Sequence, residues 1–339
     1  MENKRIQFFD ICKGILISFV VLGHIMPEKS SIHMWIYSWH MPAFFMISGM
    51  LMEYTEYDKR PLITRRGIIF EGLRKLIIPY FYYGMLLLLV RWMSTGFDSA
   101  NLKWQLVDLG LFCGIGATWF LPCLFVAQVI YYLIKHCLIC NKNNLLKSFV
   151  LFVNAVLLFA IPCVLGKQSA IMLVVLRAMI ASVFCIIGAS IVRWIFKLRN
   201  MEFGIQVIIA LVLVGVSIFV FIFTGMNTAS LNILNLGNPI LYILNALVGC
   251  SMIFVICACL EKSNCKWCKK IFEFFGSETL IVMGTHQVFM ILLGIPIKES
   301  VLLNMMFCVI IMVLEVPCII FVRKMRSIIE RIVVKENGK

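Results

Sequence analysis

Three ionisable side chains, Asp10, Lys13 and His24, lie in the first apolar stretch of the sequence, FFDICKGILISFVVLGH. A charge near the centre of a bilayer costs at least about 2.5–3.5 kcal/mol, so an ionisable residue in such a stretch is a candidate for function. A neutral imidazole, with an ordinary pKa of about 6.5, can accept the proton of a hydroxyl group near neutral pH. A buried cation can stabilise a developing oxyanion or bind phosphate. These residue types suit general-base chemistry on a hydroxyl.

The spacing of the three residues shows how a helix would place them. Asp10 and Lys13 are neighbours across one turn and can form an ion pair. Lys13 and His24 are eleven residues apart, so both point to one face, about 16 Å from each other along the axis. We expect one polar stripe through most of the membrane. The alternative is that Lys13 reaches the inner headgroups while His24 sits at the outer interface.

Two further histidines lie in apolar stretches. His40 begins the second one, in WHMPAFFMISG, and a short connection separates it from the first stretch. We therefore expect His24 and His40 at the outer ends of neighbouring antiparallel helices, as a base with a substrate-binding partner or as a metal pair. The connection adds only Glu28 and His33 as metal ligands, with no recognisable spacing, so we predict no metal site. His286 lies in the middle of a later stretch, in GTHQVF.

Other polar residues in apolar stretches allow two interpretations. Arg177 and Glu315 can pair with each other structurally or take part in catalysis. Cys137 with Cys140, and Cys265 with Cys268, form two CxxC pairs on what we predict to be the inner side. Four thiolates could hold a zinc ion. The favoured interpretation is that these thiols, like the others in this chain, are free and behave as small hydrophobic residues.

The composition identifies the solvent of this chain. Hydrophobic residues make up 62% of it and charged residues 14%, whereas a soluble domain carries roughly 25% charged residues. The bilayer is the natural environment for such a chain. The net charge of +14 comes from short basic clusters between apolar runs. That pattern indicates membrane topology and contact with lipids, and it argues against a nucleic-acid partner.

Apolar runs near the roughly 20 residues that cross a hydrocarbon core predict an all-α integral membrane protein of about ten transmembrane helices. Asp10 and Lys13 interrupt the first run, so we expect a retained helix there and not a cleaved signal peptide. We expect a single transmembrane domain over residues 1–339. The runs cover 7–26, 37–53, 76–94, 117–135, 148–165, 170–192, 204–224, 239–260, 278–295 and 301–322.

The positions of the basic residues predict the orientation. With the N-terminus in the cytoplasm, 24 of the 31 Lys and Arg residues fall on the inner side and 5 on the outer side. Cytoplasmic loops carry this excess in membrane proteins, so we expect both termini inside. The inner loop 54–75 is the most basic, and it contains Arg65, Arg66, Arg74 and Lys75. It can anchor the topology on anionic lipid, and its guanidinium groups would also suit a phosphate-bearing donor.

Several of these motifs resemble one known family. The segment from Phe9 to His24, with an acidic residue, then a basic one, then His eleven positions later, is similar to the first helix of membrane-bound acyltransferase family 3. The segment from Trp39 to Gly49 resembles the second-helix signature of that family. Its His-Met-Pro form is most similar to the branch of fucose 4-O-acetylases and related acetyltransferases. Supporting similarities lie at 74–80 (RKLIIPY), 118–122 (TWFLP) and 285–287 (THQ).

The resemblance, which covers nearly the whole chain, implies an enzyme of the bacterial plasma membrane. Such an enzyme takes an acyl group, usually acetyl, from cytoplasmic acyl-coenzyme A as donor substrate and needs no bound cofactor. It gives the group to a sugar hydroxyl of a cell-surface or exported glycan, or of a lipid-linked sugar. His24 would be the base or a transient acyl carrier, supported by Lys13 and Asp10. Substrate contacts would come from His40, Ser48, Trp119 and His286, and donor contacts from Arg65, Arg66, Arg74 and Lys75.

A polytopic transporter or flippase is the competing hypothesis, because it too would have intramembrane charges and a polar path. Transporters often show paired repeats with broken helices at matching positions. The sequence has no such symmetry, and its chemically competent residues gather in the first two apolar runs. A purely structural subunit would explain neither Lys13 nor His24. The sequence therefore favours acyl transfer.

Overall fold

The computed structural model describes residues 6–55, 67–139, 144–166, 169–295 and 300–337, and within these ranges every named element is a helix. Short 3-10 and π-helical turns extend or join the helices: η2 (Leu73–Ile77), η3 (Gly116–Trp119), η4 (Ile134–Ile139) and η5 (Leu231–Ile233). The α-helices are α1 (Gln7–Ile25), α2 (Ser31–Tyr54), α3 (Ile68–Gly72), α4 (Ile78–Ser94), α5 (Ser99–Gly110), α6 (Phe120–Leu133), α7 (Asn144–Leu165), α8 (Ala170–Asn200), α9 (Phe203–Phe223), α10 (Pro239–Lys262), α11 (Lys266–Ser277), α12 (Thr279–Leu292) and α13 (Val301–Asn337).

The predicted class, an all-α integral membrane protein, is confirmed. Among the described residues, eight helical segments are long and apolar enough to cross a membrane, and each matches one predicted span. These segments are Gln7–Ile25, Ile68–Ser94, Gly116–Cys137, Leu145–Leu165, Ala170–Asn200, Phe203–Phe223, Pro239–Lys262 and Val301–Ile328.

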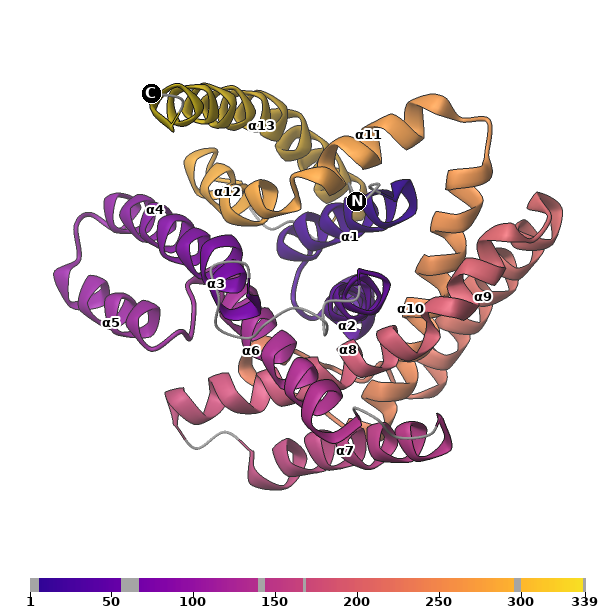
Figure 1. Cartoon of the computed structure of the whole chain (residues 1–339). Helices are drawn as coiled ribbons and strands as arrows, with labels where there is room; N and C mark the ends of the chain where they lie inside the picture. Colours follow the sequence, from indigo (N-terminus) through magenta and orange to yellow (C-terminus); the bar gives the residue numbers. More distant parts are fainter. Residues whose placement is uncertain (1–5, 56–66, 140–143, 167–168, 296–299, 338–339) are drawn as a thin grey trace.

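The other two predicted spans, 37–53 and 278–295, correspond to α2 and α12. Helix α2 has 24 residues but includes several polar ones. Figure 1 shows it near the middle of the molecule, surrounded by α1, α6, α8 and α10, so most of its surface meets protein. Helix α12 has only 14 residues, about 21 Å, which is shorter than the hydrocarbon core. The count of ten spans therefore stays a prediction.

Glycines bring the helices around α2 and α1 into close contact. A Cβ atom at Gly49 of α2 would overlap the backbone carbonyl of Cys185 on α8, and one at Gly188 of α8 would overlap the carbonyl of Met46. Helices α1 and α11 meet in the same way at Gly14 and at Gly276. Small residues allow this approach, which is how membrane helices gain packing contacts where lipid competes for apolar surface.

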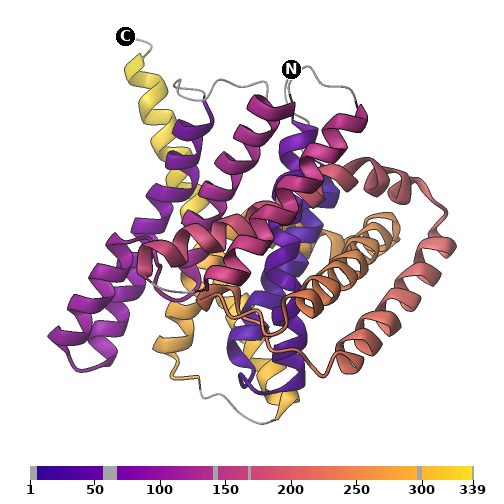
Figure 2. The same cartoon turned by 90° about the horizontal axis from the view of Figure 1, so that it is seen from below.

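Ion pairs fasten helix ends that the predicted topology assigns to the cytoplasm. Figure 2 shows the beginning of α1 and the end of α13 at the same end of the molecule, as expected when both termini lie on one side. The ion pairs there are Arg199 with Glu261 at 2.7 Å, Arg323 with Glu278 at 3.0 Å and Lys135 with Glu53 at 2.5 Å.

Candidate active site

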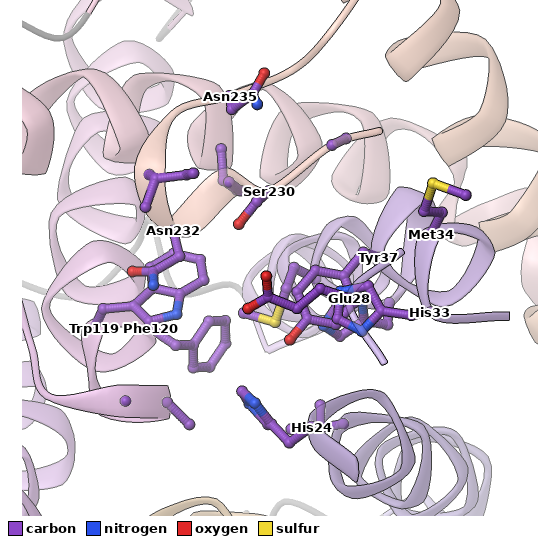
Figure 3. A pocket seen from close by; sticks show the side chains of 18 of the residues that line it. His24, Glu28, His33, Met34, Tyr37, Trp119, Phe120, Ser230, Asn232 and Asn235 are labelled. Carbon is purple, nitrogen blue, oxygen red and sulfur yellow. The ribbon is translucent and has the colours of Figure 1, made fainter. Parts of the chain in front are cut away.

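A polar cavity of about 370 Å³ lies where α1 and α2 meet, at the end that the topology assigns to the outer side. Figure 3 shows His24 extending from α1 into this space, between Trp119 and Phe120 on one side and Glu28 and Tyr37 on the other. Side chains and backbone from several elements line the cavity, among them His24, Glu28, His33, Tyr37, His40, Gly116, Ala117, Trp119, Phe120, Ser230 and Asn232.

His24 stands in the last turn of α1, and the chain around it is fixed locally. Helix α1 ends at Ile25, and Pro27 follows closely. The Nδ1–H group of His33, on α2, donates a hydrogen bond of 2.9 Å to the carbonyl of Gly23. This bond ties the end of α1 to the beginning of α2, so the half-buried His24 is held at the rim of the cavity.

Gln287 of α12 is the hydrogen-bonding partner of His24. Its Nε2 lies 3.4 Å from Nδ1 of His24, and its Oε1 accepts a bond of 3.2 Å from the backbone N–H of Ala117. The neighbouring Gly116 has φ +56°, and a side chain there would overlap Oε1 of Gln287. Glycine at this position therefore supplies both the left-handed turn and the space for the amide. The sequence interpretation noted Gln287 beside His286 but gave it no role.

His40 lines the same cavity as His24, together with two residues at helical spacing before it. His33, Tyr37 and His40 share one face of α2, and the ring of Tyr37 stacks on His33 at 3.9 Å between centroids. The ring centroid of Tyr37 also lies 4.8 Å from that of His40 and 6.4 Å from that of His24. Nδ1–H of the buried His40 donates a bond of 2.7 Å to the carbonyl of Ile36, so in the neutral ring Nε2 carries a free lone pair.

His286 lies directly behind His24. It is fully buried, and its ring centroid is 5.2 Å from that of His24. Its Nδ1–H donates a bond of 2.7 Å to the carbonyl of Val282, and its Nε2 has no hydrogen-bonding partner among the described residues. Four of the five histidines of the chain, His24, His33, His40 and His286, thus gather around this one cavity.

Trp119 forms part of the cavity wall, and Arg177 of α8 holds it from behind. The guanidinium group lies 5.2 Å from the centre of the Trp119 ring. It donates to the carbonyl of Asn232 at 3.0 Å and to that of Cys113 at 3.3 Å. Arg177 therefore connects α8, the turn before η3 and the polar loop 224–238. Of the two interpretations of Arg177 and Glu315, the structural pair is wrong: Glu315 instead accepts from Thr285 at 2.7 Å.

Lys13 and Asp10 form their expected ion pair, at 2.8 Å, but away from the cavity. On the face that Lys13 shares with His24, the intervening residues Ile17 and Val20 are apolar and buried. The expectation of one polar stripe is therefore wrong. The helix instead carries two separate polar sites at different depths. One contains Lys13 and Asp10, and the other contains His24, because each has its own set of hydrogen-bonding neighbours.

Two of the residues predicted for the donor, Arg74 and Lys75, lie at the other end of the protein. Arg74 is exposed on η2, and Lys75 pairs with Glu71 at 2.9 Å on the surface. Arg65 and Arg66 lie outside the described residues. Ser48, predicted to contact substrate, lies two turns beyond His40 on α2, where it accepts a bond of 2.9 Å from Gln128 of α6. It is not part of the cavity lining.

The CxxC pairs do not form a metal centre within the described part of the chain. Cys265 and Cys268 face each other with 2.7 Å between their Sγ atoms at the beginning of α11, and both are free thiols. Cys137 is exposed at η4, and Cys140 lies outside the described residues. Among the residues that the structure describes, no group of three or more His, Cys, Asp or Glu side chains is placed to hold a metal ion.

The sequence interpretation missed Tyr37, weighed His33 only as a possible metal ligand, and left Gln287 without a role. His33 and Tyr37 precede His40 by seven and three positions, a helical spacing that could have revealed them. The Asn-rich loop that holds Asn232 was noticeable because 224–238 contains no charged residue. Gln287 had no such signal, because its role depends on a backbone N–H that comes from residue 117.

The geometry provides an imidazole at the edge of a polar cavity, with hydrogen-bonding groups across from it and aromatic walls beside it. This arrangement suits removal of a proton from a hydroxyl of a polar ligand. Comparison with known proteins decides the class of chemistry. The model of the family described as "Acyltransferase domain" matches residues 6–323. The chain belongs to this acyltransferase family.

The curated relatives of this acyltransferase are distant. It is 28% identical over 141 residues to "Nodulation protein NolL" of Mesorhizobium japonicum, a match that covers 38% of this chain and 35% of the relative. It is 27% identical over 177 residues to the protein of the same name from Sinorhizobium fredii, covering 48% and 44% of the two chains. The matches thus span less than half the length of these relatives. No solved structure matches the chain.

Proposed function

We propose that this protein is a multi-pass O-acyltransferase of the bacterial plasma membrane. It moves an acyl group, acetyl in the first instance, from cytoplasmic acyl-coenzyme A to a sugar hydroxyl of an exported or cell-surface glycan or of a lipid-linked sugar. The observation that carries the proposal is the place of His24, in a chain of the acyltransferase family, at the rim of a polar cavity at the end that the predicted topology assigns to the outer side. The fucose 4-O-acetylase branch is the form of the family that we propose.

The cavity lining suits a sugar. Its volume of about 370 Å³ falls in the range of small-molecule sites. Glu28, Ser230 and Asn232 provide polar groups for sugar hydroxyls, while Trp119 and Phe120 provide flat apolar surfaces. A mixture of aromatic walls and a few placed polar groups is what orients such ligands.

The reaction follows from this placement. His24 accepts the proton of the acceptor hydroxyl as its oxygen attacks the thioester carbonyl carbon. A C–O bond forms, the C–S bond breaks, and the proton then passes to the leaving thiolate to give free coenzyme A. The released coenzyme A and the new ester balance the reaction, so no metal, oxidant or further cofactor is required.

The donor would approach from the cytoplasmic end. Arg74 and Lys75, with Arg65 and Arg66 of the same inner loop, would bind its phosphates. Helix α4 runs from there toward the cavity, where Leu87 packs beside Gly116. The twelve residues from Lys75 to Leu87 rise about 18 Å. We propose that the pantetheine arm spans this interval and that the acyl group arrives beside Trp119.

The test is acyl transfer by the purified protein in lipid nanodiscs from radiolabelled acetyl-coenzyme A, with cell-envelope glycans as acceptors. We expect His24→Ala to lower the transfer rate by about 10²–10⁴-fold, the usual contribution of a general base. His136→Ala is the matched control, because this fifth histidine lies exposed at η4, stacked on Tyr132 and away from the cavity. It should transfer at the wild-type rate.

Equal transfer by wild type and His24→Ala would remove His24 from the chemistry and leave His40 and His286 as the candidates. Wild-type protein that is folded by its thermal transition, yet neither binds acetyl-coenzyme A nor releases coenzyme A, would contradict the proposed function. Acyl label found on His24 itself, by mass spectrometry of the quenched protein, would show that the imidazole carries the acyl group.

A further inference from the structure

The orientation of the Gln287 amide is determined by the backbone beside it. The N–H group of Ala117 can only donate, so the atom of Gln287 that lies 3.2 Å from it must be the accepting Oε1. The turn is itself held in place, because the hydroxyl of Thr118 donates to the carbonyl of Ile115 at 2.9 Å and accepts from its N–H at 3.0 Å. The NH₂ group of Gln287 therefore faces His24.

The NH₂ group decides which nitrogen of His24 carries the proton. Nε2 of Gln287 lies 3.4 Å from Nδ1 of His24, and an amide NH₂ only donates. Nδ1 must then present a lone pair, because a proton there would place two donors face to face. A neutral imidazole has one N–H, so in the resting state the proton lies on Nε2.

His286 offers an acceptor for the proton on Nε2 of His24. Its own Nδ1–H is bound to the carbonyl of Val282, which leaves a lone pair on Nε2. This buried Nε2 has no partner among the described residues, and the two imidazole rings are 5.2 Å apart. An unpaired buried acceptor is costly, so a donor from His24 is the partner that this position can use.

We propose that Gln287 and His286 are positioning residues that fix the protonation pattern of His24, so that Nδ1 is the nitrogen that takes the acceptor proton. This inference rests on the proposed function. In the resting state the amide of Gln287 keeps Nδ1 bare by donating to its lone pair. The acceptor hydroxyl must replace this amide as the donor to Nδ1 before it gives up its proton, because a protonated Nδ1 and an NH₂ group cannot face each other. Once Nδ1 is protonated, Nε2–H of the imidazolium is the donor that the unpaired Nε2 of His286 would accept. Neither neighbour reacts with substrate.

Other titratable or charged groups also face His24, and the pH dependence must be interpreted with them. Helix α2 contributes His33, Tyr37 and His40, α12 contributes His286, and α4 contributes Arg91. Glu28 lies on the cavity wall just after α1. None of these groups is changed in the variants below, so each comparison reports the effect of Gln287 on one histidine.

The first experiment reads the protonation pattern without any reaction. Protein with ¹⁵N-labelled histidine is studied in nanodiscs by NMR, and His24→Asn identifies the His24 signals. Protonated and bare imidazole nitrogens resonate far apart, so the spectrum names the tautomer. We expect bare Nδ1 and protonated Nε2 in the wild type. In Gln287→Glu a carboxylate faces Nδ1, so we expect protonated Nδ1. Protonated Nδ1 in the neutral wild-type ring would overturn the proposal.

The second experiment follows transfer against pH. Gln287→Leu should lower kcat by about 10- to 100-fold with unchanged KM for donor and acceptor, because the imidazole loses its orientation. Gln287→Glu should move the acidic limb of the pH–rate profile up by about one pH unit or more, since a nearby carboxylate favours the imidazolium. Gln128→Leu, a glutamine that bonds Ser48 instead, is the matched control.

Wild-type kcat and pH profile in Gln287→Leu would overturn the positioning role. A thermal transition like that of the wild type shows that the variant is folded, and Gln287→Asn, with the same amide on a shorter chain, should recover activity only in part. Wild-type protein that neither binds acetyl-coenzyme A nor releases coenzyme A, but shows the expected tautomer, would contradict the proposed function and not the protonation pattern.

Discussion

His24, His40 and Arg177 show how polar side chains are accommodated inside this apolar protein. Each of the three hydrogen-bonds to a backbone carbonyl or a side-chain amide, and the partner in these hydrogen bonds is not a carboxylate. Arg177 is the extreme case, 1% exposed and bound to the carbonyls of Cys113 and Asn232. The charge of Arg177 is thus compensated by the dipoles of neutral groups. Arg177 holds the wall of the cavity in place, and its hydrogen bonds bring no carboxylate to that wall.

Replacement of Arg177 should separate acceptor binding from chemistry. In Arg177→Met the carbonyls of Cys113 and Asn232 lose their donor, and each hydrogen bond to a charged group contributes about 1.5–3 kcal/mol. We expect KM for the glycan acceptor to rise about tenfold or more, with KM for acetyl-coenzyme A unchanged, and Arg177→Lys to recover part of the loss. Steady-state kinetics with each substrate varied in turn measure this. A rise in the donor KM instead would contradict the assignment of this wall to the acceptor.

Helix α2 illustrates how the helices determine the site. It carries His33, Tyr37 and His40 to the cavity, and its other end is locked to α8 where Gly49 and Gly188 allow backbones to touch. The position of the three rings therefore depends on a contact more than one turn away along the same rigid helix. Polar residues on α2 are tolerated because its surroundings are protein.

A larger side chain at Gly188 should separate α2 from α8. Overpacking of a tight interface costs about 1–3 kcal/mol, so Gly188→Leu should lower the thermal transition by several degrees and reduce transfer through displaced His40. Gly215→Leu on α9 is the control, because a Cβ atom there meets no heavy atom within 4 Å. Intrinsic tryptophan fluorescence during heating measures the thermal transition of each variant. Equal transitions for the two variants would show that this glycine contact is not needed.

The whole molecule is polarised between its two ends. One end holds Arg74 and Lys75, both ends of the described chain and the ion pairs of Arg199 and Arg323, and the other holds the cavity around His24. An acyltransferase organised in this way would accept its donor on one side of the membrane and modify its acceptor on the other. The distribution of Lys and Arg predicts the orientation of these two ends in the membrane.

Cys265 provides a test of that orientation. It is exposed at the beginning of α11, and its hydrogen bond with Cys268 holds its pKa below the ordinary value of a thiol. A thiolate reacts fastest with a maleimide, so Cys265 should be labelled by a membrane-impermeant maleimide in inside-out vesicles and not in right-side-out vesicles. The double variant Cys265→Ser, Cys268→Ser should lose this label, as judged by mass spectrometry of the peptide. Labelling from the outside would reverse the topology.

The helical membrane class and the eight matched spans could be predicted because hydropathy follows from local composition. In lipid, a run of apolar residues must satisfy its backbone hydrogen bonds within the protein, because no water is present. A single segment can do this only by forming a helix. The two spans that match less well, α2 and α12, are those whose neighbours are protein. The length and polarity of these two helices depend on the helices that pack around them, and hydropathy along the sequence does not reveal those neighbours.

The residue types and the family could also be predicted, since His24, Lys13 and the second-helix motif are continuous in sequence, and the predicted family is confirmed. Only the tertiary structure brought His286, Gln287 and Ala117 to His24, and only it separated Lys13 from the cavity and Arg177 from Glu315. The physical reason is that a hydrogen bond depends on distance and direction in space. The donor that sets the tautomer of His24 comes from a residue 263 positions away, and no local pattern encodes that meeting.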